Sequence, residues 1–210
     1  MPRIEGHRTG ADVVRMVLEV AGELGIPYLT LYAFSSENWK RPSDEVAALM
    51  LLLEEYLERQ TKELNEKNVR LHAIGRLRDL PESCQATLRR SIQETAGNTG
   101  TNLVLALSYG GREEIIDAVK GVMQDVNAGK LREEELVPET FGRYLYTAEI
   151  PDPDLMIRTS GEMRISNFLL WQLSYAELVV VKKYWPEFTR EDFLAALEEY
   201  AGRERRFGGL

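Results

Sequence analysis

The sequence has 210 residues, of which 44% are hydrophobic and 29% charged, a balance that indicates a folded globular domain and excludes a disordered chain. Its formal net charge of −8 argues against a general nucleic-acid binder, because neutralising phosphates requires a basic surface. No apolar run reaches the roughly 18 residues that a membrane-spanning helix needs, and the polar start has no secretory pattern. The single cysteine, Cys84, is typical of a reducing compartment. We therefore expect one cytoplasmic domain over residues 1–210 with a structural Cys84.

The apolar patterns predict alternating helices and strands. In chain order these are a helix over 10–24, a strand over 28–34, a helix over 43–66, a strand over 69–74, a helix over 82–96, a strand over 102–108, a helix from 112, a short helix over 138–146, a strand over 155–157, a helix over 168–172, a strand over 178–181 and a helix over 192–204. The strands are continuously apolar, as in parallel sheets covered on both faces. The predicted fold class is therefore α/β, with a single parallel sheet and helices on both faces.

Ligands of open α/β sheets bind beyond the carboxyl ends of the strands, so the segments that follow the strands are the candidate site. These segments are SSENWKRP (35–42), SYGGR (108–112) and RTSGEMRISN (158–167). Each contains an arginine with hydroxyl or glycine residues nearby, a combination suited to phosphate oxygens. Arg158, Arg164 and Ser166 are close enough in sequence to share one ligand, and Arg3 and His7 precede the first expected helix, whose N-terminus attracts anions. The pattern predicts a local diphosphate pocket in an acidic protein.

Two further features have both a structural and a functional interpretation. An apolar stripe follows the first of these segments, and it could be ordinary core packing or the wall of a tunnel for an aliphatic substrate; its residues are Phe34, Val46, Leu49, Met50 and Leu53. Glu177, just before the last strand, could be a solvated carboxylate or a ligand of Mg²⁺.

Several long motifs resemble the cis-prenyltransferase family, specifically the bacterial undecaprenyl diphosphate synthases. The matching segments are EGHRTGA (5–11), LTLYAFSSENWKRP (29–42), TAGNTG (95–100), YGGR (109–112), DLMIRTSGEMRISNFLLWQLSYAEL (154–178) and RERRFGG (203–209). The resemblance implies a Mg²⁺-dependent homodimer that condenses isopentenyl diphosphate onto an allylic diphosphate such as farnesyl diphosphate, with cis geometry. It also implies a six-stranded parallel sheet, an apolar tunnel whose floor could include Thr101, and transient association with a membrane surface.

The resemblance also assigns roles, residue by residue. Arg158, Arg164 and Ser166 match the residues that hold isopentenyl diphosphate, whereas Arg3, His7 and Arg41 match those around the allylic diphosphate. Ser35, Asn38 and Trp39 match a loop that positions substrate and assists proton removal, and Glu45 matches an acidic residue after that loop. Glu177 matches a metal-linked carboxylate that reaches the partner subunit's site. The proton acceptor stays open between Asn38, the leaving diphosphate and a bridging water.

The sequence departs from the family pattern in two places. The family opens with a strand and an Asp-Gly-Asn-Gly-Arg-Trp loop whose Asp is the chief Mg²⁺ ligand, and neither precedes the segment at Arg3 to His7. We therefore expect an N-terminally truncated domain with five strands and little or no turnover. In addition, Met163 stands where relatives often have a polar side chain. Two alternative functions stay open: an inactive homologue that acts as a binding or partner subunit, and a generic phosphate-binding α/β module.

Overall fold

The structure is a computed structural model that describes residues 3–204, with side chains described from residue 9 onward. The helices are α1 (Arg3–Glu23), α2 (Ser43–Glu66), α3 (Glu82–Thr95), α4 (Gly111–Asn127), α5 (Pro138–Gly142) and α6 (Arg190–Ala201). The strands are β1 (Tyr28–Ser35), β2 (Arg70–Ile74), β3 (Asn102–Tyr109), β4 (Leu155–Arg158) and β5 (Glu177–Val180). These elements confirm the predicted α/β class.

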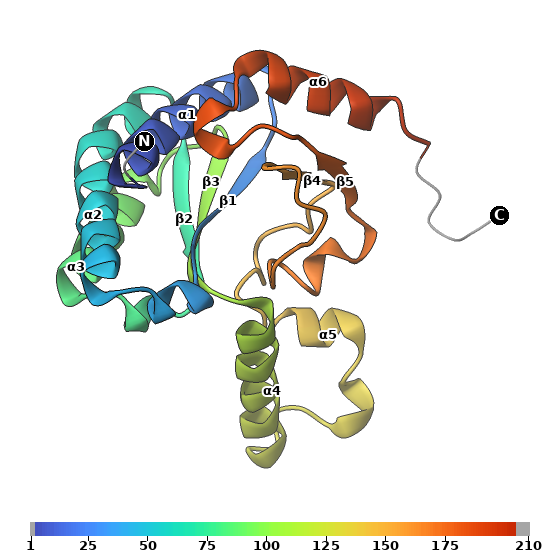
Figure 1. The fold of residues 1–210 in the computed structure, drawn as a ribbon. Coiled ribbons are helices and arrows are strands. Elements are labelled where there is room, and N and C mark those ends of the chain that lie inside the picture. The colour runs from blue at the N-terminus through green and yellow to red at the C-terminus, as the bar shows by residue number, and fades with distance from the viewer. Residues whose placement is uncertain (1–2, 205–210) are drawn as a thin grey trace.

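All strand pairs in the described residues are parallel, and the five strands form two sheets (Figure 1). The first sheet has the order β1-β3-β2, and the second pairs β4 with β5. Within the described residues no strand pairs with the second edge of β1 or with the second edge of β4. The sheet that was expected to be single is thus divided in two, and the five described strands agree with the expected number.

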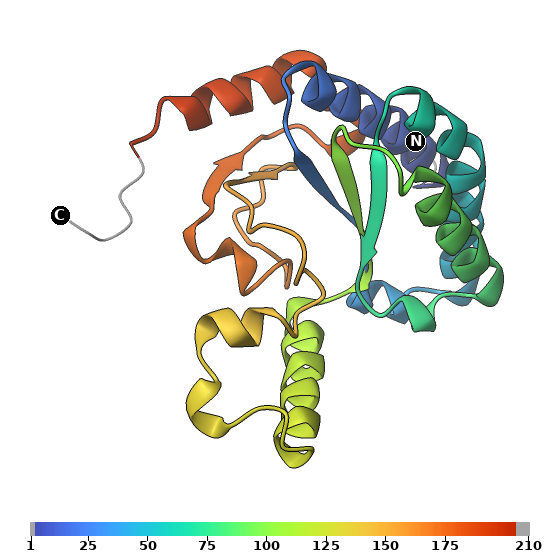
Figure 2. The ribbon, with the colours of Figure 1, turned by 180° about the vertical axis from the view of Figure 1, so that it is seen from behind.

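The central strand β3 is covered on both faces, as its continuously apolar sequence predicts. Its residues from Leu103 to Tyr109 are all buried, because α2 and α3 cover one face while the segment around Tyr146 and Phe168 covers the other. Helix α1 packs with α6 in a third cluster of buried side chains around Val17. The two helices lie along the upper edge of the ribbon in Figure 2. Burial of this continuous apolar run is the main source of stability for such a sheet.

One predicted helix, over residues 168–172, is wrong. Leu169 has a φ of 45° and Asn167 a φ of 64°, both in the left-handed region that a right-handed helix cannot contain. Only a short 3₁₀ turn, Gln172–Tyr175, follows. The apolar side chains that suggested a helix, Phe168 and Leu169, instead pack against the second face of β3.

The apolar stripe of α2 and the cysteine both lie in the core. Met50 and Phe34 are buried, and Val46, Leu49 and Leu53 pack against the same cluster. Cys84 donates its S–H to the Met50 carbonyl oxygen at 3.2 Å, and burial raises the pKa of its thiol to about 11. The thiolate is therefore disfavoured, as expected for a structural cysteine. Among the described residues, no helix combines the length and the apolar character needed to cross a bilayer.

Candidate functional site: three strand-end segments meet

The carboxyl ends of β1 and β3 lie side by side, because Ser35 and Tyr109 are register partners in the parallel pair. Helix α4 starts directly after β3 and extends away from this edge of the sheet (Figure 1). The segment after β4 reaches the same place, since the Asn167 side chain donates to Glu37 at 2.9 Å and to Glu113 at 3.1 Å. The structure thus brings together the three segments that the sequence marked as the candidate site.

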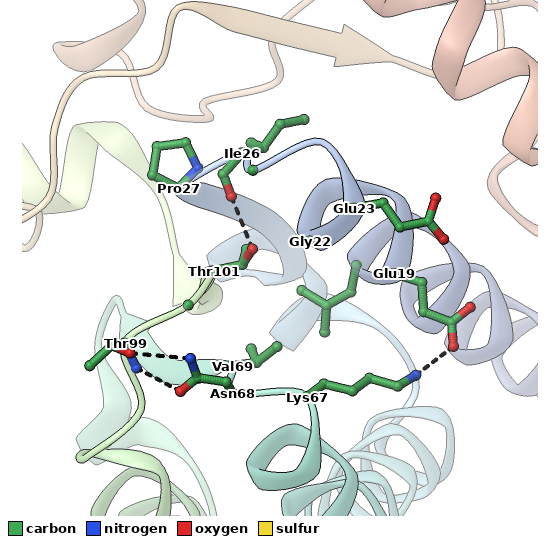
Figure 3. Close-up of a pocket in the computed structure, with 13 residues that line it drawn as sticks. Glu19, Gly22, Glu23, Ile26, Pro27, Lys67, Asn68, Val69, Thr99 and Thr101 are labelled. Carbon is green, nitrogen blue, oxygen red and sulfur yellow. Dashed lines mark hydrogen bonds and ion pairs between the residues drawn. The ribbon is translucent and has the colours of Figure 1, made fainter.

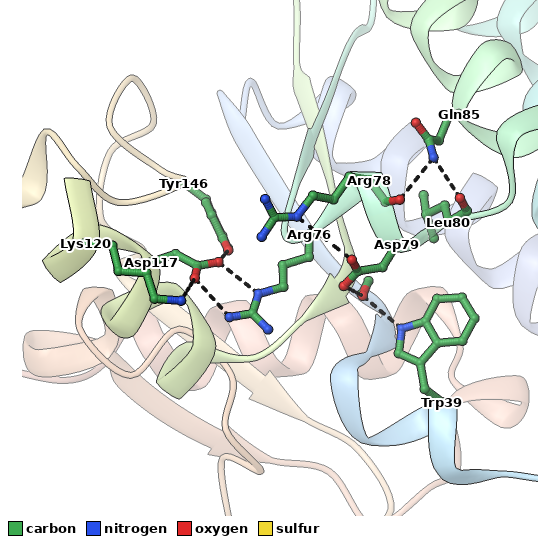
Figure 4. A network of polar contacts seen from close by, with 10 residues as sticks. Trp39, Arg76, Arg78, Asp79, Leu80, Gln85, Asp117, Lys120 and Tyr146 are labelled. Carbon is green, nitrogen blue, oxygen red and sulfur yellow. Dashed lines mark hydrogen bonds and ion pairs between the residues drawn. The ribbon is translucent and has the colours of Figure 1, made fainter. Parts of the chain in front are cut away.

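The loop after β1 is a short 3₁₀ helix, Ser36–Lys40, that is fixed at both ends. At its start, the Asn38 Oδ1 atom accepts a hydrogen bond from the Ser35 backbone N–H at 3.0 Å. At its end, the Trp39 Nε1–H donates to Ser108 Oγ at 2.9 Å, and Ser108 Oγ donates to Asp79 at 3.3 Å (Figure 4). The Ser35, Asn38 and Trp39 positions are therefore held against the end of β3.

Arg41 and Glu45 join this loop to the first turn of α2. Their side chains form an ion pair with an Nη1–Oε1 distance of 2.9 Å, and both lie at the same edge as Ser35. Glu45 therefore neutralises part of the charge that Arg41 would offer to an anion. A diphosphate that binds Arg41 would have to share its guanidinium with Glu45 or displace the carboxylate.

Arg158 is the last residue of β4 and is half-buried. Its Nε is buried and has no hydrogen-bond partner among the described residues. Burial and the Glu37 carboxylate raise the pKa of Tyr32, in β1, and the positive charge of Arg158 acts in the opposite direction. A buried donor without a partner is rare in folded proteins and is suited to an anionic ligand.

Arg164 and Ser166 lie on the exposed part of the segment after β4. Arg164 forms an ion pair with Glu162, and Ser166 has a φ of 51° in the left-handed region. No contact among the described residues joins Arg164 directly to Arg158, so their common ligand stays a prediction. The backbone turn at Ser166 is fixed by the residue that follows it, Asn167.

Asn167 and Ser108 are the residues that the sequence argument missed. Both lie inside the segments expected at strand ends, but neither is charged, and the partners of their side chains are between 29 and 130 positions away in the chain. Only their positions in the sequence could have indicated these two residues. Ser108 is the last polar residue of an apolar strand, and Asn167 directly follows an expected diphosphate ligand.

Glu177 lies away from the strand ends within this chain. It is the first residue of β5 and pairs in register with Leu155, the first residue of β4, whereas Arg158 pairs with Val180 at the other end. Its Oε2 atom is 2.7 Å from Arg203 Nη1. The structure therefore does not bring Glu177 together with Ser35 or Arg158, and only a neighbouring subunit could use it in the way that the resemblance implies.

The Arg3 and His7 positions belong to the backbone of α1, but their side chains lie outside the described residues, as does the RFGG segment after Arg205. Contacts between the Arg3 and His7 side chains and a diphosphate therefore stay a prediction.

A polar network braces the neighbouring edge between β2 and α4 (Figure 4). Arg76 binds Asp117 through two hydrogen bonds, of 2.8 and 2.9 Å, and the Tyr146 hydroxyl donates to the same carboxylate at 2.6 Å. The bonds from Arg76 lower the pKa of Asp117 to about 2. The network fixes where α4 leaves the sheet, and hence the orientation of its first turn at the site.

We expect Asp117→Asn to lower the free energy of unfolding by about 1 kcal/mol at neutral pH, because the partly exposed pair loses a charge-assisted contact. A carboxylate whose pKa is lowered on folding stabilises above its unfolded pKa, and this contribution is lost as the pH falls towards about 2. Urea unfolding at neutral and acidic pH measures the difference, which should shrink in acid. Asp12→Asn, on the exposed side of α1, is the control, and an equal difference at both pH values would contradict the prediction.

A separate hollow of about 610 Å³ lies at the opposite edge of the sheet, where the strands begin (Figure 3). It is lined by the end of α1, by Lys67 and Asn68 after α2, and by Thr101 before β3. Thr101 is buried and donates to the Ile26 carbonyl oxygen at 3.0 Å. The hollow is therefore remote from the strand-end arginines and is not the candidate diphosphate site, although it lies at the end of the core where a tunnel floor was expected.

Comparison with known proteins decides the family. The family model described as "Putative undecaprenyl diphosphate synthase" matches residues 1–208. The chain belongs to this prenyltransferase family. An isoprenyl transferase of Heliobacterium mobile is 50% identical over 210 residues, which cover 100% of this chain and 81% of the relative. A ditrans,polycis-undecaprenyl-diphosphate synthase of Micrococcus luteus, described as specific for (2E,6E)-farnesyl diphosphate, is 47% identical over 100% of this chain and 84% of its own length.

Solved structures agree with the family. Lavandulyl diphosphate synthase from Lavandula x intermedia, in complex with dimethylallyl diphosphate, superposes with a TM-score of 0.95 and 37% identity, covering 98% of this chain and 89% of that one. A probable undecaprenyl diphosphate synthase from Campylobacter jejuni gives a TM-score of 0.83 and 36% identity, covering 96% and 93%. The fold and family expected from the motifs are thereby confirmed.

Proposed function

We propose that this prenyltransferase-family chain binds isopentenyl diphosphate at the strand-end site and condenses it onto an allylic diphosphate with cis geometry to make a polyprenyl diphosphate. The observation that carries the proposal is Arg158 at the carboxyl end of β4, whose buried Nε has no hydrogen-bond partner among the described residues. A guanidinium offers paired donors that match phosphate oxygens. The nearby Ser166 and the exposed Arg164 would complete the diphosphate site.

In the proposed reaction the allylic C1–O bond breaks, a C–C bond forms to the isopentenyl unit, and a proton leaves that unit. The electrons of the broken C–O bond stay on the leaving diphosphate, where Arg41 and the exposed donors of the β1 loop would stabilise the charge. The partly buried Trp39 ring, which packs against the buried Phe34 ring with centroids 4.9 Å apart, would provide an apolar wall that keeps water from the allylic cation. Because Asn38 Oδ1 already accepts a hydrogen bond from Ser35, the leaving diphosphate or a water is the better proton acceptor.

Mg²⁺ is the cofactor that the family resemblance implies, and the described residues of this chain do not fit it. Within the described part of the chain, no three acidic, histidine or cysteine side chains gather as a set of ligands. Glu177, the expected ligand, is paired with Arg203 at the other end of β4 and β5. A Mg²⁺ site would thus need carboxylates from the loop that the resemblance places before Arg3 or from a second subunit.

A homodimer is the assembly that we propose. Helix α4 carries exposed apolar side chains on one face, namely Ile116, Val119, Met123 and Val126, and it stands clear of both sheets in Figures 1 and 2. Such a stripe at helical spacing is typical of an interaction surface. Sedimentation equilibrium tests the proposal, because a monomeric mass at micromolar concentration would contradict it.

The alternative, a binding or partner subunit without turnover, is favoured by one observation: the described residues gather no set of metal ligands. Calorimetric titration with isopentenyl diphosphate and a turnover assay with farnesyl diphosphate and Mg²⁺ distinguish the two functions. Saturable binding is expected in either case. Turnover by the 210-residue chain alone would exclude the subunit function. No turnover alone, but a gain of activity over that of a full synthase when the two are mixed, would favour it. No binding at all would overturn both.

A further inference from the structure

Asn167 is the residue through which the three segments of the site touch one another. Its Nδ2 atom donates to Glu37 at 2.9 Å, on the loop after β1, and to Glu113 at 3.1 Å, in the first turn of α4. Its Oδ1 atom accepts from the Arg112 backbone N–H at 2.9 Å, and its carbonyl oxygen accepts from the Gly111 N–H at 2.7 Å. One side chain therefore uses both ends of its amide to join loops that are up to 130 positions apart in the chain.

The backbone at this point is held in an unfavourable conformation. Ser166 and Asn167 are consecutive residues with φ of 51° and 64°. Non-glycine residues in this region cost about 1–3 kcal/mol each and persist only where the surroundings hold them, although asparagine tolerates it better than most. The four hydrogen bonds of Asn167 supply that restraint. They fix the turn that presents the Ser166 hydroxyl.

The Asn167 side-chain amide donates to two carboxylates, those of Glu37 and Glu113. Burial alone would raise the pKa of Glu37, and hydrogen bonds led by that of Asn167 outweigh it and lower the pKa. Space here is tight, since a Cβ atom on Gly110 would lie 2.2 Å from Glu113 Oε2 and 2.7 Å from Asn167 Nδ2. The side chains of Glu113 and Asn167 thus lie close against the Gly110 backbone, where the glycine leaves room for them.

We propose that Asn167 is a positioning residue for the binding of isopentenyl diphosphate. Its hydrogen bonds hold Ser166 and the segment after β4 against the loop after β1 and the start of α4. The proposal rests on the proposed function, because Ser166 must itself contact the diphosphate. Asn167 acts through Ser166 and touches no substrate. The consequence is that loss of the amide weakens binding only while the Ser166 hydroxyl is present.

The test compares Asn167→Ala and Asn167→Gly by calorimetric titration with isopentenyl diphosphate. Glycine tolerates the left-handed backbone but lacks the amide, so it separates the hydrogen bonds from the conformation. Both variants are expected to raise the dissociation constant at least about tenfold, since misplacing a binding group by about 1 Å can cost up to about 100-fold. The matched control is Asn102→Ala, which removes an asparagine that binds His72 and Pro27 at the opposite edge of the sheet and should leave the dissociation constant unchanged.

A double variant decides whether Asn167 works through Ser166. Ser166→Ala and Ser166→Ala with Asn167→Ala are expected to bind equally weakly, because neighbours that act as one unit are not additive. A merely structural asparagine would instead add its own loss to that of Ser166. Either that additivity or wild-type binding by Asn167→Gly would overturn the proposal while leaving the proposed function intact. If the unaltered chain does not bind isopentenyl diphosphate, both fall.

Discussion

Arg158→Ala should raise the dissociation constant of isopentenyl diphosphate by about 100-fold, the largest effect of any single substitution in the described site. Removing one partner of a desolvated, hydrogen-bonded charge pair costs about 2–5 kcal/mol. In the proposed complex Arg158 and the diphosphate form such a pair, because the Arg158 Nε is buried and no other described residue hydrogen-bonds to it. The free energy of unfolding should change little, since no hydrogen bond between Arg158 Nε and another described residue is lost. Calorimetry measures the first quantity and urea unfolding the second.

Two matched variants show whether the effect belongs to the site. Arg158→Lys keeps the charge but not the paired donors, so its affinity should fall between those of the alanine variant and the unaltered chain. Arg132→Ala removes an exposed arginine that pairs with Glu135, away from the strand ends, and should bind normally. If Arg158→Ala binds as tightly as Arg132→Ala, the diphosphate does not lie at the end of β4.

The second large effect is expected from completing the sheet. The facing edges of β1 and β4 carry unpaired backbone groups within the described residues, and such edges are a liability for stability and solubility. We expect that extending the chain at Met1 with a strand and an Asp-Gly-Asn-Gly-Arg-Trp loop will raise its melting temperature. The extension should also raise turnover of farnesyl and isopentenyl diphosphates with Mg²⁺ by at least about 100-fold.

The control separates the strand from its carboxylate. The same extension with Ala in place of the loop Asp should raise the melting temperature equally but should not restore turnover. Differential scanning calorimetry and a radiolabelled product assay give the two readouts. If the extension stabilises nothing, the gap between β1 and β4 does not accept a strand. Equal turnover by both extensions would show that the loop Asp is not required.

Local sequence was enough to predict those elements whose stability depends on burial of their own side chains. The run from Asn102 to Ser108 is a strand because it is apolar on both faces, and the structure covers it on both faces. Helix α2 begins at Ser43, with Asp44 and Glu45 in its first turn, where acidic side chains favour the start of a helix. The long motifs likewise predicted the family. The segments of the site could be predicted because the carboxyl ends of the strands of a parallel sheet meet at one edge.

Local apolar patterns could not predict the features of the structure that depend on contacts between distant segments. The apolar side chains of Phe168 and Leu169 suggested a helix, but the ties made by Asn167 and the surface of β3 hold this segment in left-handed turns. The distance between Glu177 and Arg158 depends on the register of β4 with β5, which no local pattern specifies.

The sequence by itself thus determined the class of fold, the family and the three segments that carry the site. Only the tertiary structure decided how the site is held. Asn167 joins the three segments, and within the described part of the chain the Arg158 Nε has no hydrogen-bond partner and no strand pairs between β1 and β4. The physical reason is that the local apolar pattern of a segment indicates which of its side chains will be buried. A hydrogen bond between residues 130 positions apart forms only when the chain has folded.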